Sequence, residues 1–310
     1  MSDQIESPNT DSEFWAIYLL YTPTAIFGAM LSGPMLLTIL TNRARLLKNT
    51  LDRIALLLLF VSFTWSLWTF LKVVLMLLVS NDRVNQANAA LTYISVVWFL
   101  FSNVFLAMSR YFLFKQWTQN KTRTYFMSGL IIAVVLSAGL IWVFSTAATT
   151  NSFVPFPAAQ YKTQTVVMFI IGAFTVVFSM SAITGLYVAT YILISRNLSV
   201  TMPSSSESQI RLRLQNRLLK SMILMSSGIV VCYLPITIAL IRKGFLNGGS
   251  LSLFPAVIVT EFVILDTVVT PAMLLYFFPK IRYTLAEKWK IFRILSGRSF
   301  SFDTEVDLED

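Results

Sequence analysis

Seven long apolar stretches constrain this chain more than any other feature of its sequence. They cover approximately residues 15–41, 51–79, 87–114, 125–148, 165–195, 219–241 and 252–278. A helix needs about 20 apolar residues to cross the hydrocarbon layer of a bilayer. Backbone polar groups in lipid must be satisfied internally, which favours helices for stretches of this length. The sequence therefore predicts an all-α membrane protein, a seven-transmembrane helix bundle.

The basic residues lie beside these stretches in an alternating pattern. Only 13% of the 310 residues are charged, yet the net charge is +9. Lysines and arginines gather at approximately 42–53, 115–123, 196–220 and 280–293, after the first, third, fifth and seventh stretches. The other side carries only Arg83, Lys162, Arg242 and Lys243. Because basic loops stay in the cytosol, the sequence predicts a multi-pass membrane protein with its N-terminus outside and its C-terminus in the cytosol. This pattern is typical of membrane topology and argues against a nucleic-acid partner.

The predicted bundle covers residues 15–279, and the two ends of the chain differ from it. Residues 1–14 are acidic and polar, as expected for an extracellular N-terminus. In the segment 280–295, apolar positions 281, 285, 289 and 292 recur at helical spacing between basic residues. This spacing predicts an amphipathic helix on the inner membrane surface, with a disordered basic tail as the alternative. Residues 296–310 have the composition of a disordered acidic cytoplasmic tail.

The supply of reactive side chains is small. The chain has one cysteine, Cys232, and no histidine. A single cysteine excludes an intrachain disulfide, and without histidine there is neither a histidine metal site nor a Ser–His pair. The sequence also lacks the HExxH pattern and paired aspartates in a GxGD setting. We therefore expect no enzyme activity, no metal and no cofactor.

Three residues inside the apolar stretches cost free energy in a membrane, so each calls for a structural or functional explanation. Arg110 lies near the cytoplasmic end of the third stretch, Pro235 in the sixth and Pro271 in the seventh. A charge is expensive at this depth, and a proline removes one helical hydrogen bond and bends the helix. These positions are candidates for function, because each provides either a buried charge or a point where a helix can pivot.

Together, the three residues form a pattern that resembles the rhodopsin-like (class A) G-protein-coupled receptors. "SRY" (109–111) is similar to the Asp-Arg-Tyr motif of helix three, and "CYLP" (232–235) to the Cys-Trp-x-Pro motif of helix six. "TPAMLLYFFPKIR" (270–282) aligns with the Asn-Pro-x-x-Tyr segment and the helix after it. The resemblance covers the whole chain in order and spacing. It implies a location in the plasma membrane with an extracellular N-terminus, and a heterotrimeric G protein as partner. It assigns activation and G-protein coupling to Ser109, Arg110, Tyr111, Tyr191, Cys232, Pro235, Thr270, Pro271 and Tyr276.

The departures from the family pattern carry predictions of their own. Ser109 replaces the acid that pairs with the arginine at rest, so we expect a weaker resting lock and raised basal activity. Tyr191 and Tyr276 are candidates to support Arg110 in the open state. Ser62 stands where helix two carries the sodium-binding aspartate, which argues against a sodium site.

The resemblance also places a ligand cavity between helices three, five, six and seven. Thr92 stands where amine receptors have an aspartate, and Ile264 where opsins have the retinal-linking lysine, which disfavours both ligand classes. Lys72 and Glu261 lie at similar depth, roughly 12–14 Å below the outer ends of their stretches. We predict that they form a buried ion pair, which either serves an extracellular small molecule or peptide or is purely structural. The candidate ligand-binding residues are Lys72, Thr92, Tyr93, Tyr233 and Glu261.

Further polar residues within the stretches receive structural roles. We expect Asp266 to bind the backbone freed by Pro271 or a water between helices. Ser102 and Asn103 are expected to form hydrogen bonds between helices. The alternative function for the whole chain is a seven-helix transporter or channel without G-protein coupling, which would need a polar path across the bundle.

Overall fold

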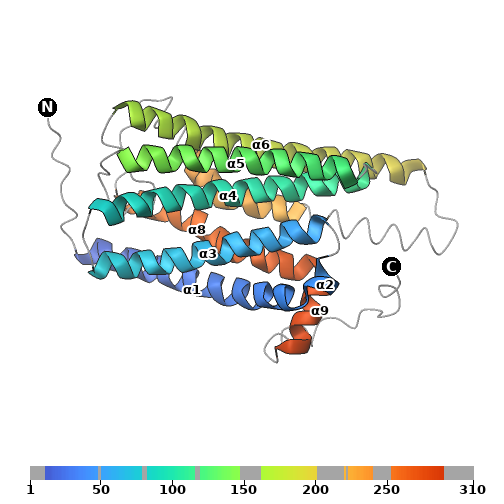
Figure 1. Cartoon of the computed structure of the whole chain (residues 1–310), viewed down its shortest axis with the longest axis horizontal. Coiled ribbons are helices and arrows are strands. Elements are labelled where there is room, and N and C mark those ends of the chain that lie inside the picture. Colours follow the sequence, from blue (N-terminus) through green and yellow to red (C-terminus); the bar gives the residue numbers. More distant parts are fainter. Residues whose placement is uncertain are drawn as a thin grey trace.

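The structure, a computed structural model, is helical in every element that it describes. It describes residues 11–47, 50–78, 82–115, 119–146, 162–200, 220, 223–239 and 253–289. The labelled helices are α1 (Asp11–Thr41), α2 (Arg43–Leu46), α3 (Thr50–Leu78), α4 (Asp82–Phe114), α5 (Gln119–Thr146), α6 (Lys162–Val200), α8 (Leu253–Phe277) and α9 (Pro279–Lys288). A further helix, unlabelled in Figure 1, is described over Ile223–Ala239. The all-α prediction is thus confirmed for the described residues.

Six helices are long and apolar enough to cross a membrane. Their spans are Tyr18–Thr41, Asp52–Leu75, Ala90–Phe112, Thr124–Val143, Phe174–Ile194 and Val257–Phe277. Each coincides with one predicted stretch, so a protein with several membrane-spanning helices is confirmed. The remaining predicted stretch, 219–241, corresponds to the helix Ile223–Ala239, which is apolar but shorter than a span over its described residues. Seven spans therefore stay a prediction.

The long helices run side by side along one axis (Figure 1). Helix α1 packs against α3 and α8, and α4 packs against α3, α5 and α6. Two-thirds of the α4 span (67%) is buried, against 22% of the α5 span, so α4 is the central helix and α5 a peripheral one. Large apolar side chains on the outer face of α5, such as Ile131, Val135 and Trp142, are exposed. Lipid is the environment that suits such a face.

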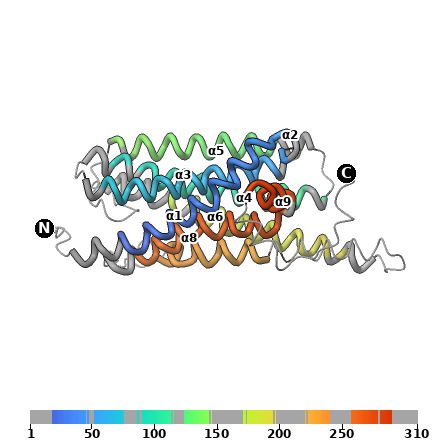
Figure 2. The backbone as a smooth tube through the Cα atoms, turned by 90° about the horizontal axis from the view of Figure 1, so that it is seen from below, coloured from blue at the N-terminus to red at the C-terminus, as the bar shows by residue number. Residues whose placement is uncertain are grey.

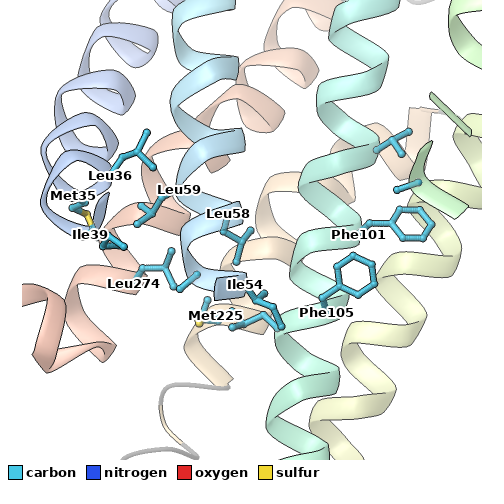
Figure 3. Packing of buried hydrophobic residues seen from close by; sticks show 14 of the residues in the cluster. Met35, Leu36, Ile39, Ile54, Leu58, Leu59, Phe101, Phe105, Met225 and Leu274 are labelled. Atoms are coloured by element: carbon cyan, nitrogen blue, oxygen red, sulfur yellow. The ribbon is translucent and has the colours of Figure 1, made fainter. Parts of the chain in front are cut away.

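The largest apolar core lies toward the α9 end of the bundle. It joins Met35 and Ile39 of α1 to Leu58 of α3 and Leu274 of α8 (Figure 3). Phe105 of α4 extends this core toward α5, where its ring meets Phe126 edge-on at 5.1 Å between centroids. These contacts hold the two halves of the bundle together at the end where the predicted cytoplasmic residues lie.

Small and polar residues hold α1, α3 and α8 together in the middle of the bundle. Pro271 lacks the N–H that would bond the carbonyl of Thr267 within α8. That carbonyl instead accepts a hydrogen bond of 2.8 Å from the hydroxyl of Ser62 on α3. Asp266 was predicted to bind this backbone or a water between helices. The bond to the backbone is not formed, since its Oδ1 accepts a bond of 2.9 Å from Thr270, and the water stays a prediction. A carboxylate has no proton to offer a carbonyl, whereas a hydroxyl has one.

Helix α9 lies across the end of the bundle rather than along it (Figures 1 and 2). Of the predicted apolar positions, Ile281 and Leu285 are buried in the core, and Trp289, just beyond the helix end, is exposed. The Nζ of Lys288 donates a 2.8 Å hydrogen bond to Thr41 Oγ1 at the end of α1. A helix after the bundle is therefore present, but its apolar residues pack on the bundle. Its contact with the inner leaflet stays a prediction, as do the expectations for residues 1–10 and 290–310, which lie outside the described residues.

Candidate functional site

A narrow cavity lies between α1, α3, α4 and α8, toward the predicted extracellular end of the bundle. Its free space is about 10 Å³, roughly what one water molecule needs. It is lined by Tyr21, Trp65, Trp68, Thr69, Lys72, Thr92, Thr260, Val263 and Ile264. In terms of the predicted spans it lies among the first, second, third and seventh. The expected ligand cavity lay among the third, fifth, sixth and seventh, so this space is on a different side of the bundle.

Two nitrogen donors in this cavity have no hydrogen-bond partner among the described residues. The Nζ of Lys72 is one, on a side chain that is only 4% exposed. The Nε1 of Trp68 is the other. Residues four apart on a helix lie on the same face, so α3 presents both donors to the same side. An unpaired buried donor is costly, and a pair of them on one cavity wall favours an acceptor group between them.

The predicted ion pair between Lys72 and Glu261 is not formed. Glu261 Oε1 instead accepts a hydrogen bond of 2.5 Å from Thr24 Oγ1 of α1. Its Oε2 is buried without a partner in the described part of the chain, as is the Nζ of Lys72. The depths of the two residues are similar, but depth alone does not decide which face of α8 the carboxylate occupies. Glu261 is turned toward α1, and its neighbour Thr260 faces the cavity.

The other candidate ligand-binding residues divide into two groups. Thr92 lines the cavity and is buried. Tyr93 and Tyr233 do not line it. Tyr233 is fully buried, and its hydroxyl interacts with the carboxylate of Asp266 across the contact between the 223–239 helix and α8. The geometry of this contact falls short of a hydrogen bond, since neither Tyr233 Oη nor Asp266 Oδ2 has a bonded partner among the described residues.

Arg110 lies inside the bundle at the opposite end of α4. Its side chain is only 4% exposed, so it does not extend into the surrounding interface as a snorkelling arginine does. The guanidinium interacts with the hydroxyl of Tyr187 on α6, through its charge and a side-chain hydrogen bond. Ser109 and Tyr111 are partly exposed, and Lys115 Nζ lies 5.6 Å from the centroid of the Tyr111 ring. The arginine is thus held between α4 and α6.

The tyrosines expected to support Arg110 point elsewhere in this structure. Tyr191 is 49% exposed and Tyr276 is 53% exposed. Their role in an open state stays a prediction. Sequence reasoning missed Tyr187, although a signal was present: Ile183, Tyr187, Thr190 and Ile194 recur at helical spacing, and all four are buried. Tyr191 lies outside that periodic face.

The 223–239 helix, which contains Pro235, meets α8, which contains Pro271, at a polar cluster in mid-bundle. Cys232, Thr270 and Pro271 are buried, and Pro235 is partly buried within the 223–239 helix. Asp266 joins the two helices, because it binds Thr270 and interacts with Cys232 and Tyr233. Every candidate of the helix-six and helix-seven motifs except Tyr276 is therefore turned inward.

Two polar residues of α4 bond differently from the prediction. Ser102 Oγ and Asn103 Nδ2 donate to the carbonyls of Trp98 and Phe99 of the same helix, at 2.6 and 3.1 Å. The expected bonds between helices from these groups are not formed in the described structure. Trp98 supplies such a bond instead, since its Nε1 donates to Ser137 Oγ of α5 at 3.1 Å.

No protein-family model matches the chain, and no curated protein is significantly similar to it. In the described part of the chain, no three residues of the metal-binding types gather close enough to hold an ion. In this part of the chain, the candidate functional features are the Lys72 cavity, the Arg110 contact and the polar cluster between the 223–239 helix and α8.

Proposed function

We propose that this protein is a seven-transmembrane receptor of the plasma membrane that transmits the binding of an extracellular ligand to a heterotrimeric G protein. The observation that carries the proposal is Arg110, a charged residue enclosed at the predicted cytoplasmic end of α4. A buried charge at membrane depth is expensive and marks a functional position. Its position in the "SRY" motif, with the prolines of the sixth and seventh stretches at receptor spacing, supports the same reading.

The proposed mechanism is a shift between two packings of the same helices. Ligand binding favours a state in which the 223–239 helix pivots near Pro235 and its cytoplasmic end moves outward. Arg110 then leaves Tyr187 and becomes available to the G protein. The contact between Tyr233 and Asp266 lies beside the pivot. This contact is therefore expected to change when the helix pivots.

Two further features support the orientation and the membrane surface. Helix α9 lies across the bundle at the end where α1 finishes, as a helix along a membrane surface would. Tyr283 and Trp289 are exposed on or next to it, and both are residue types that favour the membrane interface. We assign this end to the cytoplasmic leaflet.

The test is nucleotide exchange on purified G proteins reconstituted with this protein in nanodiscs. Basal exchange above that of empty nanodiscs is expected, because Ser109 leaves Arg110 without an acidic neighbour in the motif. Arg110→Ala should abolish this exchange, and Arg53→Ala, a change at an exposed arginine of α3, should not. Exchange equal in the Arg110→Ala variant and the wild type would refute the coupling role. Substrate flux into proteoliposomes, with no exchange on any G protein, would favour the transporter or channel.

A further inference from the structure

We propose that the cavity holding Lys72 and Trp68 binds the carboxylate group of a small organic acid. This rests on the proposed function in one respect only, that the acid is the extracellular ligand. The binding itself follows from the two unpartnered donors and is testable without any G protein. The proposal replaces the ion pair that the sequence suggested, because the structure leaves the lysine free of Glu261.

The first argument is the chemistry of the two donors. Lys72 Nζ and Trp68 Nε1 are both buried, and neither has a hydrogen-bond partner among the described residues. An ammonium taken out of water without a counter-charge is strongly unfavourable. A carboxylate supplies the charge and also the lone pairs, since its two oxygens accept from both groups at once. A neutral ligand would satisfy the hydrogen bonds and leave the charge uncompensated.

The second argument is the composition of the remaining wall. Trp65, Val263 and Ile264 form an apolar side of the cavity. The hydroxyl of Tyr21 is already engaged, because it donates to the carbonyl of Val257 at 3.1 Å. Apolar lining beside two donors suits an organic acid better than a fully hydrated inorganic anion.

The third argument concerns size and the nearest acid. Free space of about 10 Å³ holds about one water molecule, so only the headgroup of a ligand can enter between the donors, and the lining side chains must move apart to admit the three heavy atoms of a carboxylate. The carboxylate of Glu261 does not occupy this role, because it accepts a hydrogen bond from Thr24 on α1. The cavity is thus proposed as a site for the headgroup alone.

The experiment is thermal unfolding of the purified full chain in nanodiscs with matched probes. Acetate, propionate and benzoate are compared with acetamide, propionamide and benzamide, and chloride serves as the inorganic anion. A ligand that binds only the folded state raises the unfolding midpoint in a saturable way. The carboxylates are expected to do so, and the amides and chloride are not.

Variants tie the effect to the cavity. Lys72→Met should weaken carboxylate binding by about 10- to 100-fold, as expected for the loss of one hydrogen bond to a charged group. It should also leave the unliganded protein at least as stable, because an unpaired buried charge is removed. Trp68→Phe should weaken binding by a smaller factor. Glu261→Gln and Lys280→Met, at an exposed lysine of α9, should retain it.

The outcomes separate this inference from the proposed function. Carboxylate binding that depends on Lys72, with no G-protein nucleotide exchange, would support the binding site and refute the proposed receptor function. No stabilisation by any of the three acids, equal stabilisation by amides or chloride, or full binding in Lys72→Met would overturn the site. A receptor that exchanges nucleotide through Arg110 would then remain, with its ligand bound elsewhere.

Discussion

Gly28 lies at a point where α1 closely approaches α3 and α8. A Cβ atom built there lies 2.5 Å from the hydroxyl of Ser66 and 2.7 Å from Thr267 Oγ1. The serine hydroxyl can rotate away. The hydroxyl of Thr267 is held by a 2.7 Å bond to the carbonyl of Ile264, and its branched side chain has few rotamers in a helix. Gly28→Ala should therefore push α1 away from α8.

The size of this effect follows from two opposing terms. Inserting a methyl group into a packed core costs about 1–3 kcal/mol. Replacing glycine by alanine inside a helix returns up to about 1 kcal/mol. Gly139 of α5 provides the matched control, because a Cβ there meets nothing within 4 Å. Both variants gain the same stabilisation from helix propensity. The difference between their free energies of unfolding therefore isolates the packing cost of about 1–3 kcal/mol.

The measurement is the unfolding midpoint of Gly28→Ala and Gly139→Ala in the same detergent. We expect the first below the second, with the second equal to or above the wild type. In the double variant Gly28→Ala with Thr267→Ala, the threonine side chain that the new methyl group meets is also removed. The double variant should therefore be less destabilised than the sum of the two single changes. Equal midpoints for the two single variants would show that α1 adjusts freely, and would refute the argument for a tight contact.

Three further predictions concern the polar contacts. Ser62→Ala should lower the free energy of unfolding by about 1–3 kcal/mol, because a buried carbonyl of α8 loses its donor; an unchanged denaturation midpoint would contradict this. Tyr187→Phe should raise basal G-protein nucleotide exchange by freeing Arg110, and a decrease would show that the contact belongs to the active state. Ser109→Asp should lower basal exchange by restoring an acidic partner to Arg110. Unchanged basal exchange would contradict the proposal that Ser109 weakens the resting lock.

The helix pattern of this chain was predictable because membrane spans are set by length and hydropathy. Six predicted stretches match six helices, and the buried face of α6 that carries Tyr187 was also readable in the spacing. The hydrogen-bond partner of each polar side chain was not predictable from the sequence. The partners of Ser62, Glu261 and Thr24 depend on the rotation of α1, α3 and α8 about their own axes. Depth along a helix follows from counting residues, but rotation follows from packing against neighbours distant in the sequence.

The bond from Ser62 to Thr267 has a consequence for how the protein is made. The two residues are 205 positions apart, which a ribosome covers in about 10–40 s. During that time α1 and α3 have already been made, and the space bounded by Gly28 of α1 and by Ser62 and Ser66 of α3 lacks Thr267 of α8. Only the last long helix, α8, closes it. A nascent chain stopped before α8 would therefore display small polar groups to lipid, a mark by which cellular quality control can distinguish an unfinished bundle from a complete one.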